Sequence, residues 1–164
     1  MNDLLSRIAP QREARALHPH PIELHTLLLA SVAACRRRHN VYLTGDTGLS
    51  VIADPAALEQ AISHLLDNAI DASPPGAQVS IQVTANADAA SIAIIDEGAG
   101  MDADFIRNRL FQPFASTKQD GFGVGAFEAK SLIAAMGGRL TVDSRPGHGT
   151  RFIIALPLPR RIAA

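Results

Sequence analysis

Two pairs of short strands, each joined by a brief turn, are the feature that most constrains the fold. VSIQVTA at 79–85 alternates apolar and polar residues, and SIAIID at 91–96 follows it after NADA. RLTVDS at 139–144 and TRFIIALP at 150–157 likewise flank RPGHG. Such closely connected strands predict antiparallel hairpins. Because long helical segments separate them, we predict an α+β fold in which three helices cover one face of a mostly antiparallel sheet.

The three predicted helices are the segments 22–38, 55–73 and 125–138. Asp54 followed by Pro55 is a strong start signal for the second helix, and SPPG ends it. Two β runs, VYLTG at 41–45 and SVIAD at 50–54, lie around a Gly-Asp turn. We expect the glycine-rich stretch 97–122 to be irregular, and MNDLLSRIAP to be helical before a Pro-broken linker.

Composition excludes several classes of function. A chain of 164 residues indicates one domain with a single core. The net charge of −1, the absence of Trp and the single Tyr give no reason to expect a nucleic-acid partner. The lone Cys35 excludes an intramolecular disulfide and fits a reducing compartment. The longest apolar run, LLLASVAAC, is too short to cross a bilayer, so we predict no membrane segment in this chain.

The second helix carries polar residues beside its buried stripe. His64, Asn68 and Asp71 follow one another in steps of four and three residues. Asn68 lies at the edge of the apolar arc, and its neutral carbonyl oxygen suits Mg²⁺, which keeps waters and takes phosphate ligands. For an arbitrary helix, a solvated face is the simpler interpretation. The arc itself consists of Leu58, Ala61, Ile62, Leu65, Leu66, Ala69 and Ala72.

Two glycine-rich motifs could bind a ligand. In DEGAG at 96–100, Asp96 ends a strand and could accept a hydrogen bond from a ligand amine, although an isolated motif of this kind is usually a turn. GFGVGAFEA at 121–129 fits Gly-x-Gly-x-x-Ala, but no strand precedes it, which rejects the dinucleotide-binding interpretation. What remains is a glycine loop opening a helix whose N–H groups could receive phosphate.

Two further motifs are ambiguous when they are taken singly. LFQPFASTK at 110–118 could pin a surface loop, or Lys118 could reach a phosphate. RPGHGT at 145–150 is explained by a hairpin turn, and Thr150 is its only candidate for ligand contact.

Taken in order, these motifs resemble the ATP-binding catalytic domain of sensor histidine kinases, from the superfamily that includes gyrase, Hsp90 and MutL. The resemblance covers residues 22–158. It implies the Bergerat fold, a two-layer α/β sandwich, with ATP and Mg²⁺ as cofactors. Residues 1–21 would end a helical dimerisation and phosphoacceptor region, and 159–164 would form a tail. The run FASTKQDGFGVGAFEA also resembles sensor kinases of exosortase-linked (PEP-CTERM) polysaccharide systems.

The resemblance also implies a role for each matching residue. Asn68 would hold Mg²⁺, Asp96 would accept from the adenine amino group, and Asn68, His64 and Lys118 are the catalytic candidates. The segment from about 102 to 122 would be a lid anchored by Phe111 and Phe114. The nucleotide-binding candidates are Asn68, Asp71, Ala72, Asp96, Gly98, Gly100, Met101, Phe114, Lys118, Gly121, Gly123, Val124, Gly125 and Thr150.

Two positions depart from the family pattern. Many members have Asn where this chain has His64, and Lys or Arg where it has Asp71. Hydrolytic relatives place a Glu one helical turn before the Mg²⁺-binding Asn, so His64 indicates that no carboxylate is positioned as a general base. Poor water attack suits phosphoryl transfer to a protein, which depends chiefly on positioning and charge neutralisation.

The implied partners are a helical domain with the phosphoacceptor histidine, from the same protein, and a response regulator downstream. None of the six His residues is followed by Asp or Glu, as the acceptor histidine typically is. The expected location is cytoplasmic, in a parent protein that an inner-membrane anchor could hold. The alternatives are a serine kinase of the anti-sigma type and a nucleotide-binding pseudokinase that transmits only conformation.

Overall fold

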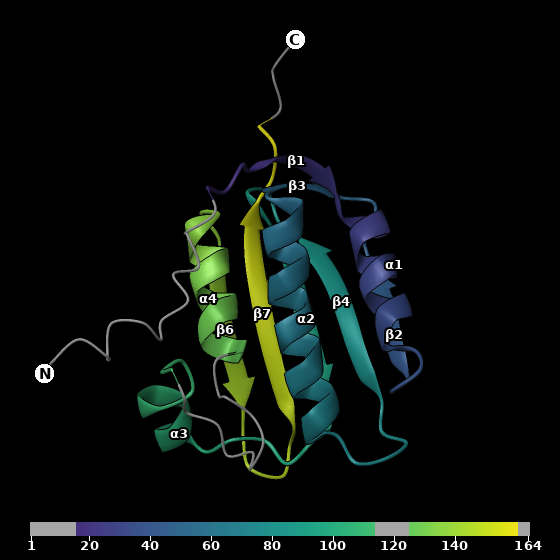
Figure 1. Cartoon of the computed structure of the whole chain (residues 1–164), viewed down its shortest axis with the longest axis vertical. Helices are drawn as coiled ribbons and strands as arrows, with labels where there is room; N and C mark the ends of the chain where they lie inside the picture. The colour runs from purple at the N-terminus through teal and green to yellow at the C-terminus, as the bar shows by residue number, and fades with distance from the viewer. Residues whose placement is uncertain (1–15, 114–124, 161–164) are drawn as a thin grey trace, which may run out of the picture.

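The protein is built around a five-stranded sheet, seen in a computed structural model that describes residues 16–113 and 125–160 (Figure 1). The strand order is β2-β4-β5-β7-β6. The bounds are β2 Val41–Gly45, β4 Val79–Ala85, β5 Ala89–Asp96, β6 Arg139–Ser144 and β7 Thr150–Pro157.

The two predicted hairpins are confirmed. β4 pairs antiparallel with β5, β6 pairs antiparallel with β7, and β5 joins the hairpins by pairing antiparallel with β7. β2 runs parallel to β4, so the sheet is mixed although mostly antiparallel. The register sets Asp96 at the end of β5 opposite Thr150 at the start of β7. Two candidate site residues are therefore neighbours at one end of the central strands.

The expectation for the first part of the chain was partly wrong. The runs at 41–45 and 50–54 are confirmed as strands: β2 joins the main sheet, and β3, Ser50–Ala53, pairs with β1, His20–Glu23. β1 lies where we expected linker and the start of the first helix. Its Pro21 stands opposite Ile52 in a two-stranded ribbon, where a missing N–H is tolerated on the unpaired side.

Three helices cover one face of the sheet, as predicted (Figure 1). They are α1 Leu24–Cys35, α2 Pro55–Ala72 and α4 Gly125–Ala135. α2 lies in the middle and packs against α1, α4, β4 and β5. The core between these two layers includes the fully buried side chains of Leu24, Leu28, Leu58, Ile62, Leu65, Leu66, Ile81, Ile92, Ile94, Ile133, Ile154 and Leu156.

α2 begins at its predicted signal. Pro55 is the first helical residue, and the carboxylate Oδ1 of Asp54 accepts from the N–H of Ala57 at 3.0 Å. The other oxygen, Oδ2, accepts from the N–H of His18. At the far end the apolar arc was wrong by one residue, since Ala72 is exposed and Ile70 is buried in its place. The last turn therefore has its small residue outside the core, facing the loop after β5.

A short fourth helix, α3 Ala103–Asn108, lies within the stretch that we expected to be irregular. The side chain of Asp102 caps it by accepting from the N–H of Phe105 at 2.8 Å. The remainder of that stretch, from 114 to 124, lies outside the described residues. Among residues 16–113 and 125–160, no helix combines the length and apolar character needed to cross a bilayer.

Candidate functional site

Asp96 is a buried carboxylate at the end of β5, with 4% of its surface exposed. Its Oδ1 accepts from the N–H of Gly98 at 2.8 Å, which fixes the direction of the carboxylate. Burial raises the pKa of the Asp96 carboxyl, and hydrogen bonds from the backbone of Gly98 and Thr150 offset part of that rise. A desolvated, oriented carboxylate of this kind is a strong acceptor for a ligand amine.

Gly98 lets the loop after β5 touch the end of α2. A Cβ on Gly98 would lie 2.4 Å from the carbonyl oxygen of Ala72, which is far inside van der Waals contact. The loop and the last turn of α2 are thus in direct backbone contact. This contact sets Ala72, a candidate for nucleotide binding, directly beside the Asp96 motif.

The same loop also packs on the turn between β6 and β7. A Cβ on Gly100, whose φ is +71°, would lie 2.0 Å from the carbonyl oxygen of Arg145. A Cβ on Gly149, whose φ is +72°, would lie 2.0 Å from the carbonyl oxygen of Asp96. Glycine is therefore required at Gly100 and Gly149 because the DEGAG and RPGHGT segments pack closely against each other, and not only because of each segment's own turn. Gly149 was not among the predicted site residues, and its Gly-x-Gly-Thr context was the available signal.

Ser144 ties these segments together and was missed by the sequence prediction. Its hydroxyl lies 2.8 Å from Thr150 Oγ1, accepts from the N–H of Met101 at 2.9 Å and donates to the carbonyl oxygen of Gly149 at 2.8 Å. Thr150 is 6% exposed and Met101 is partly buried. The predicted residues Met101 and Thr150 thus belong to one polar cluster with Asp96. A single Ser at the end of a strand gives no sequence signal for such a role.

Asn68 lies one helical turn before Ala72 on α2, about 6 Å along the helix axis. A Cβ on Gly125 would lie 3.7 Å from Asn68 Oδ1, in ordinary van der Waals contact, so the first residue of α4 lies beside the amide without a side chain between them. Within the described part of the chain, the Asn68 amide has no hydrogen-bond partner. The amide oxygen is therefore available to a ligand. A lone neutral oxygen fits Mg²⁺, which completes its shell with waters and phosphate oxygens.

His64 faces a carboxylate that the sequence prediction did not place. Its Nε2 lies 2.8 Å from Oε2 of Glu128, in the first turn of α4, and each side chain is 28% exposed. Among the described residues His64 Nε2 has no hydrogen-bond partner, so this is a close contact that becomes an ion pair only when His64 is protonated. This contact does not test the prediction that no carboxylate is positioned as a general base, and Glu128 comes from a distant part of the chain. It faces His64, and position 64 itself still lacks a Glu.

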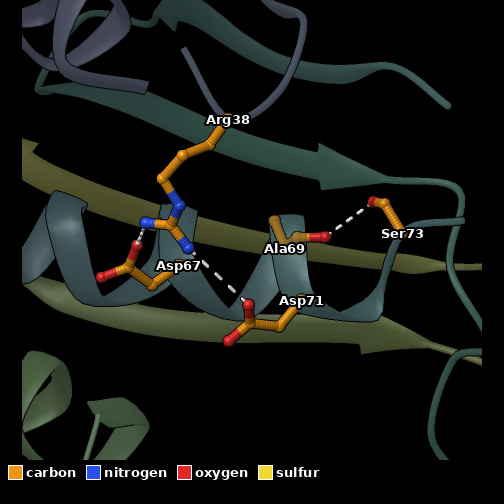
Figure 2. A network of polar contacts seen from close by, with 5 residues as sticks. All are labelled: Arg38, Asp67, Ala69, Asp71 and Ser73. Atoms are coloured by element: carbon orange, nitrogen blue, oxygen red, sulfur yellow. Dashed lines mark hydrogen bonds and ion pairs between the residues drawn. The ribbon is translucent and has the colours of Figure 1, made fainter. Parts of the chain in front are cut away.

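Asp71 takes part in a network with the segment after α1 (Figure 2). The guanidinium of Arg38 lies 2.6 Å from Asp67 Oδ1 and 3.7 Å from Asp71 Oδ1. The hydrogen bond to Asp67 and its charge raise the pKa of Arg38, and the charge of Asp71 adds to the effect. These side chains are about half exposed, so the network contributes at most about 1 kcal/mol to stability. Asp71 is thus paired with Arg38 at the margin of the candidate site.

The remaining candidates lie in or next to the segment 114–124. Phe111, a predicted anchor, has its ring 4.4 Å from the Nζ of Lys130 on α4, a cation–π contact. Outside the described residues lie Phe114, Lys118, Gly121, Gly123 and Val124.

The described candidates form two groups joined by α2. Asp96, with its neighbours from the loops and β7, lies at the C-terminal end of the helix, and Asn68, with His64 and Gly125, lies one turn earlier. The first group can recognise a hydrogen-bond donor in a buried setting. The second can hold a metal ion next to the N-terminus of α4, where anions are favoured. A ligand with a planar base at one end and phosphates at the other fits this order.

Alanine substitutions at two glycines should separate folding from binding. Gly98→Ala should destabilise the protein by about 1–3 kcal/mol, since its Cβ meets the Ala72 backbone.

Gly125→Ala should leave the melting temperature unchanged or higher, because Ala favours helices, yet weaken Mg²⁺-ATP binding by filling the space beside Asn68. Thermal unfolding and calorimetric titration measure both effects. Unchanged affinity in Gly125→Ala would show that no ligand uses that space.

The chain is similar to curated sensor kinases. The chain is 30% identical over 160 residues to the sensor histidine kinase ZraS of Escherichia coli O157:H7, covering 96% of this chain and 35% of that protein. It is 36% identical over 116 residues to the alginate biosynthesis sensor protein KinB of Pseudomonas aeruginosa, covering 70% of this chain and 19% of that protein. The chain therefore spans about a third or less of these curated relatives.

Solved structures show the same fold. The mycobacterial sensor histidine kinase MprB superposes with a TM-score of 0.76 at 28% identity, over 86% of this chain and 98% of that one. Full-length ShkA, in complex with AMPPNP, superposes with a TM-score of 0.79 at 24% identity, over 90% of this chain and 33% of that one. Residues 53–160 match the family described as histidine kinase-, DNA gyrase B- and HSP90-like ATPase. The chain belongs to this family, as an ATP-binding catalytic domain of the histidine kinase type.

Proposed function

We propose that this domain binds ATP with Mg²⁺ and transfers the γ-phosphoryl group to a histidine on a separate helical domain of the same protein. The observation that carries the proposal is the buried, oriented carboxylate of Asp96, whose loop meets α2 at Ala72. Ala72 follows Asn68 by one helical turn, and among the described residues the Asn68 amide has no hydrogen-bond partner. Base recognition and phosphate positioning are thereby arranged along one helix. The complex of ShkA with AMPPNP gives a related fold that holds an ATP analogue.

At the base end, Asp96 accepts a hydrogen bond from the adenine amino group. Gly98 and Gly100 keep the backbone close to the base, and Met101 covers it from the loop before α3. Thr150 contacts the ligand side of Asp96 while its hydroxyl stays bonded to Ser144. A site built to pair with an amine should reject guanine, which offers a carbonyl oxygen at that position.

At the phosphate end, the amide oxygen of Asn68 is the protein ligand for Mg²⁺. When bound, the ion neutralises the charge that develops on the phosphates during transfer. Ala72 leaves room beside the loop, and Gly125 leaves room beside the amide. His64 and Asp71 flank the phosphates, and Arg38 supplies a cation next to Asp71. From the family resemblance we further assign nucleotide contacts to Phe114, Lys118, Gly121, Gly123 and Val124.

The domain's own contribution to transfer is positioning. Its described residues bind both ends of the nucleotide and hold the γ-phosphate toward the face where an acceptor domain docks. The acceptor histidine, a response regulator downstream and a cytoplasmic location are part of the proposal. The family relatives and the run FASTKQDGFGVGAFEA support these assignments, and that run also favours a parent protein of the exosortase-linked type.

The test is a transfer assay with radiolabelled ATP and a separately supplied helical hairpin from the parent protein. We expect label on the hairpin that survives base and is lost in acid, as phosphohistidine is. Label on serine would contradict the proposal and favour the anti-sigma type of kinase. Tight ATP binding with no transfer to any histidine domain would favour the pseudokinase.

A further inference from the structure

We propose that Ser144 determines base specificity by taking the hydroxyl proton of Thr150, so that Thr150 and Asp96 both present only acceptor oxygens to the base. The ligand that fits is a base with an exocyclic amine, whose two hydrogens these two side chains accept. The proposal rests on the function proposed above, because it takes Asp96 as the base-binding residue. It assigns a role to a residue of β6 that the nucleotide-binding motifs do not include.

Asp96, Thr150 and Ser144 form a row across three strands. The register sets Asp96 of β5 opposite Thr150 of β7, and Thr150 opposite Ser144 of β6. Directly opposed residues of antiparallel strands carry their side chains on the same face of the sheet, with Cβ atoms about 4.5–5.5 Å apart. The next row on this face packs in the core beneath the helices and consists of Ile94, Phe152 and Val142. Three polar side chains therefore lie side by side at the end of an apolar face.

The hydrogen bonds of Ser144 fix the direction of the Thr150 hydroxyl. Ser144 has one proton to donate, and the carbonyl oxygen of Gly149, 2.8 Å away, can only accept it. The N–H of Met101 donates to Ser144 at 2.9 Å. The contact of 2.8 Å between the two hydroxyls therefore uses the proton of Thr150. Thr150 Oγ1 keeps only lone pairs for a further partner.

Asp96 and Thr150 then offer two acceptors on neighbouring strands. The N–H of Gly98 holds one carboxylate oxygen of Asp96 in place. An amine that donates through both of its hydrogens, at N···O distances near 2.9 Å, has its acceptors about 5 Å apart. This separation agrees with the spacing of directly opposed strand residues. A carbonyl oxygen in the same place meets lone pairs from both side chains, so the row favours an amino-substituted base over an oxo-substituted one.

A purely structural explanation of Ser144 must be tested against this one. Its bonds to Met101 and Gly149 join the loop after β5 to the β6–β7 turn, and that junction alone stabilises the protein. Loss of the junction lowers the affinity for every nucleotide alike. Release of the Thr150 proton changes the preference between bases. The ratio of two affinities, measured on the same variant, therefore separates the explanations.

The first experiment measures displacement of a fluorescent ATP analogue by ATP and by inosine triphosphate, which carries a carbonyl oxygen in place of the amine. In Ser144→Ala the ratio of ATP affinity to inosine triphosphate affinity should fall about fivefold, as expected for one neutral hydrogen bond. The Thr150 hydroxyl is then free to donate to the carbonyl oxygen. Ser144→Thr keeps the hydroxyl and should retain the parent ratio. Thr141→Ala, which removes an exposed hydroxyl from the same strand, is the matched control. An unchanged ratio in Ser144→Ala would overturn the proposal.

The second experiment keeps Ser144 and changes its partner. Thr150→Val has the same shape without the hydroxyl, and it should weaken ATP binding about fivefold while inosine triphosphate binds no more weakly than to the parent. Thr150→Ser should retain the parent ratio. Adding Ser144→Ala to Thr150→Val should leave the ratio where Thr150→Val set it. Equal losses for both nucleotides in Thr150→Val, or a further change of ratio in the double variant, would overturn the proposal.

The two proposals fail in different ways. If Asp96→Asn leaves ATP affinity unchanged, the proposed base site itself fails. If Asp96→Asn weakens ATP binding while the ratio does not respond to Ser144 or Thr150, only the role of Ser144 fails.

Discussion

Asp96→Asn is expected to weaken ATP binding by at least about tenfold while the protein stays folded. The ligand amine would lose a hydrogen bond to a charged, desolvated acceptor, and such bonds are worth roughly 1.5–3 kcal/mol. Asparagine has the same shape, and its amide oxygen can still accept from the N–H of Gly98. Calorimetric titration with ATP and ADP measures the loss. Asp143→Asn, at an exposed position on β6, is the matched control.

The same variant should change which base is preferred. The asparagine NH₂ group can donate to the carbonyl oxygen of guanine, which the aspartate repels. We therefore expect the ratio of ATP affinity to GTP affinity to fall as ATP binding weakens. If ATP affinity stays unchanged, Asp96 is not the base-recognising group.

Although Asp96→Asn should weaken ATP binding, it should make the folded protein more stable than the parent as pH rises. Because burial raises the pKa of Asp96 above 3.8, the folded protein holds a proton that the unfolded chain has released just above that pH. The contribution of Asp96 to stability is therefore present in acid and lost as pH rises through the folded-state pKa. Asn at this position does not ionise, so the variant should gain stability relative to the parent as pH increases from about 4 to 7. Denaturant unfolding at several pH values follows this difference.

Asn68→Ala is expected to abolish most of the gain that Mg²⁺ gives to ATP binding. Affinity at saturating Mg²⁺ should fall at least about tenfold, because the ion loses its protein ligand. Affinity in EDTA should stay within about threefold, since the base end of the site is untouched. Alanine is a better helix former than asparagine, so α2 should remain folded. Titrations with and without Mg²⁺ give the two numbers directly.

Asp67→Ala is the control for Asn68→Ala. It removes the adjacent polar residue of α2, whose carboxylate accepts a hydrogen bond from Arg38 (Figure 2). Its cost should be at most about 1 kcal/mol of stability, with no change in the effect of Mg²⁺. Equal losses of affinity with and without Mg²⁺ in Asn68→Ala would show that the amide contacts the nucleotide and does not hold the ion.

The parts of the fold that were predicted correctly depend on neighbours in the sequence. The β4–β5 and β6–β7 hairpins follow from alternation and short turns, and α2 follows from Asp54 and Pro55. The wrong predictions depend on distant partners. β1 becomes a strand only because β3 pairs with it. β2 was predicted as a strand, but its parallel partner, which comes after the whole of α2, was not predicted. No local pattern in HPIE or VYLTG identifies such a partner.

The residues of the candidate site likewise fall into those that a local motif predicts and those that depend on distant contacts. Asp96 and Gly98 form one short motif, which the sequence shows at once. Glu128 meets His64 only because α4 packs on α2, and Ser144 meets Met101 only because the loop after β5 packs on the β6–β7 turn. Glu128 and Ser144 were missed because a contact between elements far apart in the sequence leaves no trace in the spacing of either.

Because Gly98 contacts Ala72, α2 fixes the distance between the two ends of the proposed ligand site. In the proposed site, one continuous helix carries Asn68, assigned to the metal, and Ala72, beside the base-binding loop, and the helical rise alone sets the interval between them. Loops can move around a bound molecule, but this interval changes only if the helix bends. The proposed function therefore implies that the backbone of α2 selects ligands by the distance between base and phosphates.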